Sequence, residues 1–461
     1  MKIKIAKGIE KTSEELIKLA QKYTWFVNGH EQSDFGEPGK ISVSQSGNYL
    51  TDIYGNTYLE GLSGFAGCTL GRSNSHIIEA IVEELRTNPI VISGGGATPK
   101  QILLSQKIAE RMPDKGEHLN HVCYGMSGSD ANETAFKIAR QYWKIQGQST
   151  KYKVISRWGS YHGCHLGAVS ASGFTFRRVG AEPLPPGFIH MNPPQCYYCP
   201  YKMIYPDCNL ECAEELARLI EREDPSTVAA WIGDLVITAL GPLPVPPEYP
   251  RRIREICDKY GVLMIVDEVI TGWGRMGTWT ASEYYGIVPD MLTLAKGVSA
   301  LYVPLSVTVV KDDITRVFTG KNVFQHVYTM AGNPVSAACG LAVIEYIEEH
   351  NILEEVKRKG ALGKAENDKL PQEFKCVGAA YSIGLEFGMQ LVKDREKREK
   401  FPDEDAMGKV LVETGRKQGV LIYPFHGSVG TMPSLIVTDD ELLKLFHALR
   451  EGLRAVERRF L

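Results

Sequence analysis

The sequence lacks several features that would each define a class of protein. Its 461 residues carry 52 lysines and arginines against 55 aspartates and glutamates, so there is no basic excess to indicate a nucleic-acid-binding surface. No stretch approaches the roughly 18 uninterrupted apolar residues of a membrane-spanning helix. The N-terminal segment mixes lysine and glutamate with apolar residues, unlike a signal peptide. We therefore expect a cytoplasmic protein whose partners are small molecules, not nucleic acids or membranes.

Cysteine is also scarce, because ten residues in a chain of this length are few for a disulfide scaffold. Six of them are scattered singly, and we expect them to be buried: Cys68, Cys123, Cys164, Cys257, Cys339 and Cys376. The other four form the pattern C-x2-C-x8-C-x3-C, and they are Cys196, Cys199, Cys208 and Cys212. This spacing is compatible with a structural zinc or iron–sulfur site, with free thiols that pack a loop, or with disulfides.

The chain is too long for one hydrophobic core, since single cores stop growing near roughly 250 to 300 residues. Helical patterns alternate with short runs rich in β-branched residues, which favours an α/β fold with a largely parallel sheet. The expected helices cover residues 75–86, 101–111, 130–142 and 250–260. The expected strands cover residues 121–124, 153–156, 227–232, 262–267, 291–295 and 305–310.

These patterns predict one large and one smaller α/β domain. We assign residues 1–65 to an N-terminal segment of the small domain, 66–319 to the large domain and 320–461 to the rest of the small domain. Proline, tyrosine and cysteine crowd together from 180 to 206 without periodicity, so we expect a loop or insertion at about 180–212 that contains the cysteine cluster.

Two polar residues stand where predicted strands end, which is where α/β sheets bind their ligands. Lys296 follows the apolar run MLTLA, and Asp267 ends the run IVD within IVDEVITGWGRMG. Taken alone, Lys296 fits a surface lysine in a turn, and Asp267 fits a cap at a strand-to-loop turn. Because an unpaired carboxylate at this position is costly, Asp267 instead favours a partner such as a protonated ring nitrogen.

Two further motifs fit a flat, phosphorylated cofactor. In MSGSDANETAFKIAR, Gly128 and Ser129 open a helix, whose first amides and positive dipole end favour a phosphate. A plain helix cap fits the same residues, and the absence of a Walker lysine argues against a nucleoside triphosphate. In GSYHGCH, Tyr161 is placed either to stack on a flat ring or to pack in the core.

Together, SGSDANE, YHG, DEVITGWGRMG, LAKGV and YTMAGNPVSAA resemble the class III aminotransferases along nearly the whole chain. The resemblance is to the ω-amino acid and taurine:pyruvate branch. It implies a fold-type I enzyme with a seven-stranded large-domain sheet, a homodimer or dimer of dimers, and active sites shared between subunits. The implied cofactor is pyridoxal 5′-phosphate (PLP).

The resemblance also implies a role for each matching residue. Lys296 would carry PLP as a Schiff base and shuttle the proton, and Asp267 would pair with the pyridinium nitrogen. The other cofactor contacts would be Val269 under the ring, Tyr161 stacked on it, Gly128 and Ser129 at the phosphate, and Thr329 reaching the phosphate across the dimer interface. The amino group would pass from an amine donor to a 2-oxo acid such as pyruvate or 2-oxoglutarate. Racemases, decarboxylases and lyases use the same machinery and remain alternatives. An inactive relative is disfavoured because Lys296 and Asp267 are both present.

The chain departs from the family pattern at two positions near the expected substrate site. Asp234 and Leu235 replace the usual Glu-Pro, and Gly430 stands where many relatives have an arginine that binds the substrate carboxylate. The donor therefore lacks a carboxylate at that distance, or another arginine holds it, such as Arg177, Arg178 or Arg275. We expect ω-amines, ω- or β-amino acids or their derivatives as donors. The candidate substrate residues are Trp25, Asp234 and Arg275.

Overall fold

The computed structural model describes residues 2–27, 31–88 and 96–461. Its centre is a seven-stranded sheet with the order β6-β12-β11-β10-β9-β7-β8. The strands are β6 (Leu119–Gly125), β7 (Lys153–Arg157), β8 (Phe188–Met191), β9 (Val228–Gly233), β10 (Leu263–Asp267), β11 (Met291–Leu294) and β12 (Ser306–Lys311). Only β12 runs antiparallel to its neighbours, so the predicted, mostly parallel sheet is confirmed.

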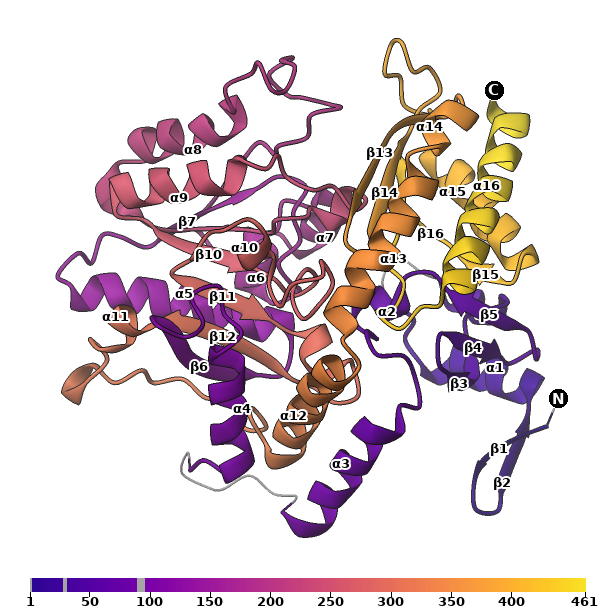
Figure 1. Cartoon of the computed structure of the whole chain (residues 1–461), viewed down its shortest axis with the longest axis horizontal. Helices are drawn as coiled ribbons and strands as arrows, with labels where there is room; N and C mark the ends of the chain where they lie inside the picture. The colour runs from indigo at the N-terminus through magenta and orange to yellow at the C-terminus, as the bar shows by residue number, and fades with distance from the viewer. Residues whose placement is uncertain (1, 28–30, 89–95) are drawn as a thin grey trace.

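Helices cover both faces of this sheet (Figure 1). Met264 and Val266 of β10 pack in one cluster with α8 (Glu211–Arg222) and α9 (Tyr249–Tyr260), whereas Leu263 and Ile265 pack in another with α5 (Gly128–Ile145). Alternate residues of the strand therefore face opposite helical layers, as the period of a strand requires. This burial on both faces explains why the sheet strands appear in the sequence as continuous apolar runs.

Further helices lie between residues 63 and 315. They are α2 (Ser63–Ala66), α3 (Ser75–Thr87), α4 (Pro99–Ala109), α6 (Leu166–Ala171), α7 (Thr175–Arg178), α10 (Ala281–Tyr284) and α11 (Asp312–Thr315). A turn of 3-10 helix at Lys296–Ser299 follows β11. The expected helices at 75–86, 101–111, 130–142 and 250–260 are therefore present, with ends shifted by a few residues.

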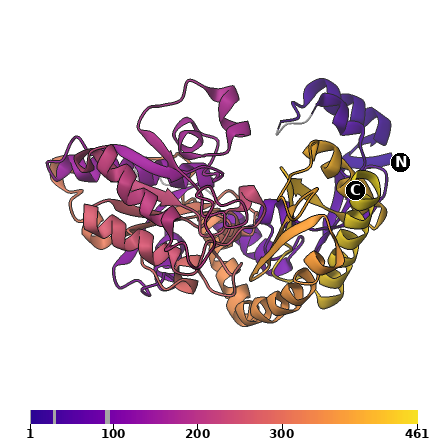
Figure 2. The ribbon, with the colours of Figure 1, turned by 90° about the horizontal axis from the view of Figure 1, so that it is seen from above.

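Two four-stranded sheets form the smaller part of the molecule. One has the order β15-β5-β4-β3 and the other β13-β14-β17-β16. The strands are β3 (Ser42–Ser46), β4 (Tyr49–Asp52), β5 (Thr57–Glu60), β13 (Val377–Ile383), β14 (Glu386–Leu391), β15 (Val420–Leu421), β16 (Tyr423–Phe425) and β17 (Ser428–Thr431). Because β5 pairs with β15, the two ends of the chain share one sheet, and both termini lie in this part (Figure 2). This pairing supports the predicted domain limits, which stay a prediction.

The remaining elements belong to the two ends of the chain. They are β1 (Lys2–Ala6), β2 (Ile9–Thr12), α1 (Ser13–Tyr23), α12 (Pro334–Glu349), α13 (Ile352–Asn367), α14 (Leu370–Glu373), α15 (Glu404–Lys417) and α16 (Asp439–Phe460). Helix α12 packs against α3 and α4, so the first long helix after residue 320 lies against the large domain. No helix in the described part of the chain is long and apolar enough to cross a membrane.

The segment at 180–206 corrects one expectation from the sequence. Four of its residues, Phe188–Met191, form the edge strand β8, which pairs in parallel with β7. An edge strand this short leaves no helical or alternating pattern long enough to recognise, because prolines and polar residues flank it on both sides. Apart from the end of a 3-10 turn at Val179–Ala181, the rest of the segment is irregular, as predicted.

Candidate active site

Lys296 stands at the carboxyl end of β11, in the first position of the 3-10 turn, with φ +48°. A non-glycine residue in this left-handed region is strained, and such strain persists where the surrounding structure holds it. The side chain is half-buried. Burial lowers the pKa of its amine to about 8, with Arg275 acting in the same direction while Asp267 and Glu386 oppose it. An amine that loses its proton this readily is suited to act as a nucleophile and a base near neutral pH.

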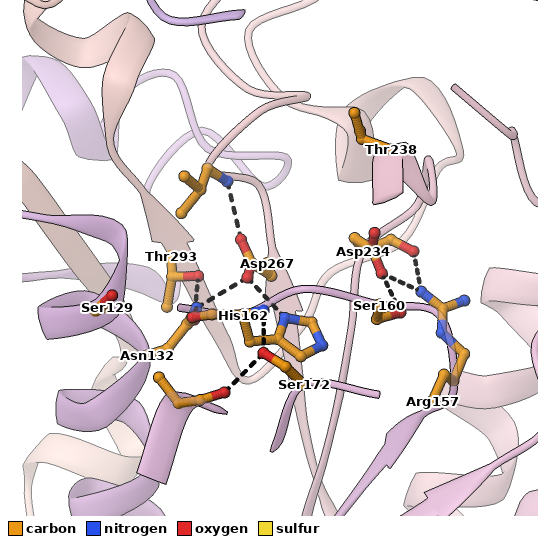
Figure 3. A network of polar contacts seen from close by, with 12 residues as sticks. Ser129, Asn132, Arg157, Ser160, His162, Ser172, Asp234, Thr238, Asp267 and Thr293 are labelled. Carbon is orange, nitrogen blue, oxygen red and sulfur yellow. Dashed lines mark hydrogen bonds and ion pairs between the residues drawn. The ribbon is translucent and has the colours of Figure 1, made fainter. Parts of the chain in front are cut away.

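Asp267 ends the neighbouring strand β10 and is only 5% exposed. Its Oδ2 accepts hydrogen bonds from Asn132 Nδ2 and His162 Nδ1, each at 2.8 Å, and its Oδ1 accepts one from the backbone N–H of Val269 at 3.0 Å (Figure 3). Three donors therefore fix the orientation of the carboxylate. Oδ1 keeps a lone pair for one further donor, such as a protonated ring nitrogen.

Asn132 and His162 are residues that sequence reasoning missed. Thr293 Oγ1 donates to Asn132 Oδ1 at 2.8 Å, and the His162 backbone N–H donates to Ser172 Oγ at 2.8 Å (Figure 3). Both residues are buried, and the network joins α5 to β11 and to the segment after β7. The motifs SGSDANE and YHG contain both residues, so the signal was present, but nothing local to either motif shows that its polar side chain points at Asp267.

The N-terminus of α5 lies beside the loop that follows Asp267. Ser127 and Asp130 form a capping box there, in which the Asp130 N–H donates to Ser127 Oγ at 3.2 Å. The N–H groups of Gly128 and Ser129, the first two helical residues, have no intrahelical acceptor. A Cβ added to Gly128 would lie 2.9 and 3.0 Å from the two methyl groups of Val269, so this position admits only a glycine without rearrangement. Ser129 Oγ accepts a hydrogen bond from the backbone N–H of Cys164 at 3.1 Å. Cys164 is exposed, which corrects the expectation that it is buried.

Gly128→Ala is expected to weaken cofactor binding about tenfold, because the added methyl group must displace Val269 or the helix terminus, and such overpacking costs about 1–3 kcal/mol. Titration of cofactor-free protein with PLP, followed by tryptophan fluorescence, measures the change. Gly36→Ala is the control, since the nearest atom to its added Cβ lies 3.9 Å away. Equal affinities in the two variants would contradict the predicted phosphate site.

The other predicted cofactor contacts are more exposed. Tyr161 is 42% exposed, and the Arg177 guanidinium lies 5.9 Å from its ring centroid. Val269 is half-buried beside Asp267. Thr329 is exposed, and its predicted contact across a dimer interface stays a prediction. Trp25 follows α1 and is 85% exposed, so this chain alone does not bury it against the site.

The structure gives two predicted substrate residues other partners. Asp234 Oδ1 accepts hydrogen bonds from Arg157 Nη2 at 2.6 Å and Ser160 Oγ at 2.7 Å (Figure 3). Arg275 is fully buried, and its Nη atoms donate to Pro433 O, Ser63 Oγ and Ala66 O. The guanidinium of Arg275 therefore joins distant segments of the chain, and its predicted role in substrate binding stays a prediction.

The four clustered cysteines line one pocket. All four are free thiols. Among residues 2–27, 31–88 and 96–461, no group of three or more histidine, cysteine or acidic side chains is arranged to hold a metal ion. Burial raises the pKa of the Cys196 thiol, and that of Cys212 to about 12, and the neighbouring thiols of the cluster act in the same direction. The described residues thus give no support to the predicted zinc or iron–sulfur site, and free thiols that pack a loop stay the alternative.

The arrangement fits PLP. Lys296 offers an amine for the aldehyde, Asp267 an acceptor for the ring nitrogen, and the first turn of α5 a cradle for the phosphate in which Gly128 leaves room beside Val269. These positions lie at the carboxyl ends of adjacent parallel strands and at the start of the helix packed on them. Fold and site together define an enzyme of the fold-type I, PLP-dependent class.

Comparison with known proteins gives the family. A family model described as Aminotransferase class-III matches residues 38–453. The chain is 32% identical to a taurine–pyruvate aminotransferase of Bilophila wadsworthia, over 97% of this chain and 98% of the relative. It is also 32% identical to a putrescine–pyruvate aminotransferase of Pseudomonas aeruginosa, over 90% of each chain.

Solved structures of transaminases share the fold of this chain. An (S)-enantioselective omega-transaminase from Thermomicrobium roseum superposes with a TM-score of 0.92 at 32% identity, covering 97% of this chain and 99% of the other. A PLP-bound amine transaminase from an uncultivated Pseudomonas species has a TM-score of 0.88 at 29% identity, covering 94% and 98%. The protein belongs to the class III aminotransferase family, and it is an aminotransferase.

Proposed function

We propose that this aminotransferase takes the amino group of an ω-amine, an ω- or β-amino acid or a derivative of one, and passes it to a 2-oxo acid such as pyruvate or 2-oxoglutarate. The observation that carries the proposal is Gly430, on β17. A Cβ at this position would overlap the ring of Pro242, so no side chain can extend from it. The chain therefore has no arginine at 430 to bind the carboxylate of an ordinary α-amino acid.

The remaining candidate arginines support the same donors. Arg275 is committed to backbone and hydroxyl acceptors, and Arg178 lies 5.1 Å from the Trp158 ring, with Glu182 3.9 Å away. Arg177 lies over the ring of Tyr161, the residue expected to stack on the cofactor, and is the arginine that we assign to the carboxylate of the 2-oxo acid. The taurine and putrescine substrates in the names of two relatives are amines without an α-carboxylate, which fits this assignment.

The residues of the site divide the work of the reaction. PLP, when bound, supplies an electron-withdrawing ring that makes the proton on the amine-bearing carbon of the donor acidic. Lys296, whose lowered pKa favours the free amine, is the residue that would take up that proton and release it again. Asp267, held by Asn132 and His162, would offer its remaining acceptor to the ring nitrogen. The α5 terminus would hold the phosphate. The relatives are aminotransferases, and no observation favours the racemase, decarboxylase or lyase alternatives.

We further propose that the protein works as a homodimer or a dimer of dimers in the cytoplasm. The segment around Thr329 supports a subunit interface, because the apolar side chains of Val327 and Met330 are exposed on either side of it. In such an assembly, Thr329 would complete the phosphate site of the partner subunit.

Three four-carbon donors test the proposed substrate class: butylamine, 4-aminobutanoate and 2-aminobutanoate, each with pyruvate as acceptor. We expect kcat/KM for butylamine and 4-aminobutanoate to exceed that for 2-aminobutanoate by about 10- to 100-fold. This ratio corresponds to the loss of one charge-assisted hydrogen bond to the α-carboxylate. Alanine formation, followed by chromatography, is the readout, and reactions without pyruvate are the control. A preference for 2-aminobutanoate would contradict the proposed donor class while leaving the aminotransferase chemistry intact.

A further inference from the structure

The chain that leads to Thr329 is an extended segment, residues 322–329, which we call the strap. It lies between α11 and α12 in the sequence (Figure 1), and residues 323–328 belong to no helix or strand. Exposure alternates along it. The half-buried residues are Asn322, Phe324, His326 and Tyr328, and the residues between them are exposed. A period of two is that of an extended chain with one face on the protein and one face outward, and Thr329 follows on the outward face.

The inward face of the strap lies on α5. Gln141 Nε2 donates to Asn322 O at 3.3 Å, and the ring nitrogens of His326 each lie 2.9 Å from a side-chain atom of Thr134 or Lys137. Thr134, Lys137 and Gln141 are spaced by three and four residues, so they share one face of the helix. The strap therefore runs along this face from Gln141 towards the first turn of α5, in the direction opposite to the helix.

The hydrogen bonds of His326 assign the proton of its ring. Lys137 Nζ is a donor, so it donates to His326 Nδ1, which carries no proton. The neutral ring then has its proton on Nε2, which donates to Thr134 Oγ1. Thr134 in turn donates to Asp130 O at 2.7 Å. Burial lowers the pKa of His326, and Lys137 acts in the same direction against Asp130, which agrees with a neutral ring near neutral pH.

This relay of hydrogen bonds ends in the first turn of α5. Asp130 is the third residue of the helix, and it follows directly on Gly128 and Ser129, whose amides we assign to the phosphate. Asp130 also closes the capping box that fixes the helix terminus. His326 thus ties the middle of the strap to the turn that would hold the phosphate.

The strap has a second anchor just beyond Thr329. A Cβ added to Gly332 would lie 2.7 Å from Gln101 Nε2 and 3.0 Å from Tyr124 Cγ, so the chain is closely packed there. Thr329 itself is exposed. Because an exposed side chain does little to fix its own place, the anchors on either side, His326 and Gly332, set where Thr329 lies.

We propose that His326 is a positioning residue of the phosphate site: it fastens the strap along α5 and so fixes the place from which Thr329 meets the phosphate. This inference rests on the proposed function only in taking Thr329 as a phosphate contact. His326 does not touch the cofactor in this assignment, and it acts through Thr134 and the strap.

Titration of cofactor-free protein with PLP, and with pyridoxal, which lacks the phosphate, tests this role. His326→Phe keeps a ring beside Phe324 and Tyr328, whose centroids lie 5.1 and 4.7 Å from that of His326, but it removes both hydrogen bonds. We expect the Kd for PLP to rise about tenfold and the Kd for pyridoxal to stay within about twofold. His326→Gln keeps one donor and one acceptor, so it should bind PLP within about threefold of the parent protein.

Thr329→Val shows whether the effect of His326 passes through Thr329. This variant should weaken PLP binding about tenfold. Adding His326→Phe to it should cause no further loss, because the contact that His326 positions is already absent. A full additional loss in the double variant would overturn the proposal. An equal loss of PLP and pyridoxal affinity in His326→Phe, as a merely structural role predicts, would also overturn it.

His350→Phe is the matched control. The ring of His350 also stacks on a tyrosine, with its centroid 3.9 Å from that of Tyr346, but it lies at the end of α12. It should leave both affinities unchanged. If His326→Phe does not fold, Lys137→Met replaces it, since Lys137 is exposed and its loss removes the donor to Nδ1.

We expect Lys137→Met to weaken PLP binding about two- to threefold and to leave pyridoxal binding unchanged. Unchanged PLP affinity in a folded Lys137→Met or His326→Phe protein would contradict the positioning role. Failure of the amine donor panel would leave these titrations untouched, because they contain no donor, so the two proposals can fail separately.

Discussion

Replacing Lys296 by alanine is expected to reduce amino transfer by about 10⁴-fold or more, because the change removes both the covalent attachment for the cofactor and the base that moves the proton. The half-reaction with an amine donor, measured in single turnover with added PLP, gives the rate. The variant should also lose its bound cofactor on gel filtration, since the phosphate cradle and Asp267 remain but the covalent link does not.

The control for this variant is Lys144→Ala, which removes an exposed lysine from the last turn of α5. It should keep full activity and full cofactor content. A Lys296→Ala protein that retained even a tenth of the transfer rate would assign the chemistry to another amine. Melting curves of both variants separate a catalytic loss from a loss of folded protein.

Asp267→Asn is expected to lower kcat by about 10²- to 10³-fold while PLP remains attached to Lys296, the loss typical of removing one preorganised electrostatic contact. The carboxylate offers acceptors on both oxygens, and three donors already converge on it. The asparagine amide has an N–H₂ group in place of one carboxylate oxygen. This group faces another donor, and it does not hold the ring nitrogen in its protonated form.

Absorbance of the bound cofactor and kcat for a good amine donor are the two measurements for Asp267→Asn. Asp368→Asn serves as the control, because Asp368 is an exposed carboxylate that pairs with Lys364. If the Asp267 variant lost all bound PLP, the carboxylate would be an anchor for the cofactor. If its kcat were unchanged, the ring nitrogen would have another partner.

The buried position of Arg275 gives this arginine a structural role in the chain. This arginine holds the turn at Ser63–Ala66, where Ser63, Phe65 and Ala66 all have positive φ. Leu301, just beyond the Lys296 turn, packs against Gly64 and Gly67 of the same segment. The hydrogen bonds of Arg275 thus hold the strained turn at Ser63–Ala66 in contact with the turn that begins at Lys296.

Much of the fold could be predicted because its signals are local. The strands of the central sheet are continuous apolar runs between turn residues, and α5 begins at a capping box that is legible in the sequence. Lys296 and Asp267 were placed together because the carboxyl ends of parallel strands meet at one edge of a sheet. The helix α13 and the strands β13 and β14 were not predicted, since their patterns are weak and their burial depends on partners elsewhere in the chain.

The sequence by itself indicated the family, which the comparisons confirm, and it predicted the cofactor, the attachment lysine and its acidic partner, because each depends on a motif of adjacent residues. Only the tertiary structure decided which side chains support them. Asp267 meets His162 and Asn132 across 105 and 135 residues, and the Nη atoms of Arg275 donate to the chain near Ser63 and Pro433. Such contacts follow from how the layers pack, and no periodicity or spacing along the chain encodes them.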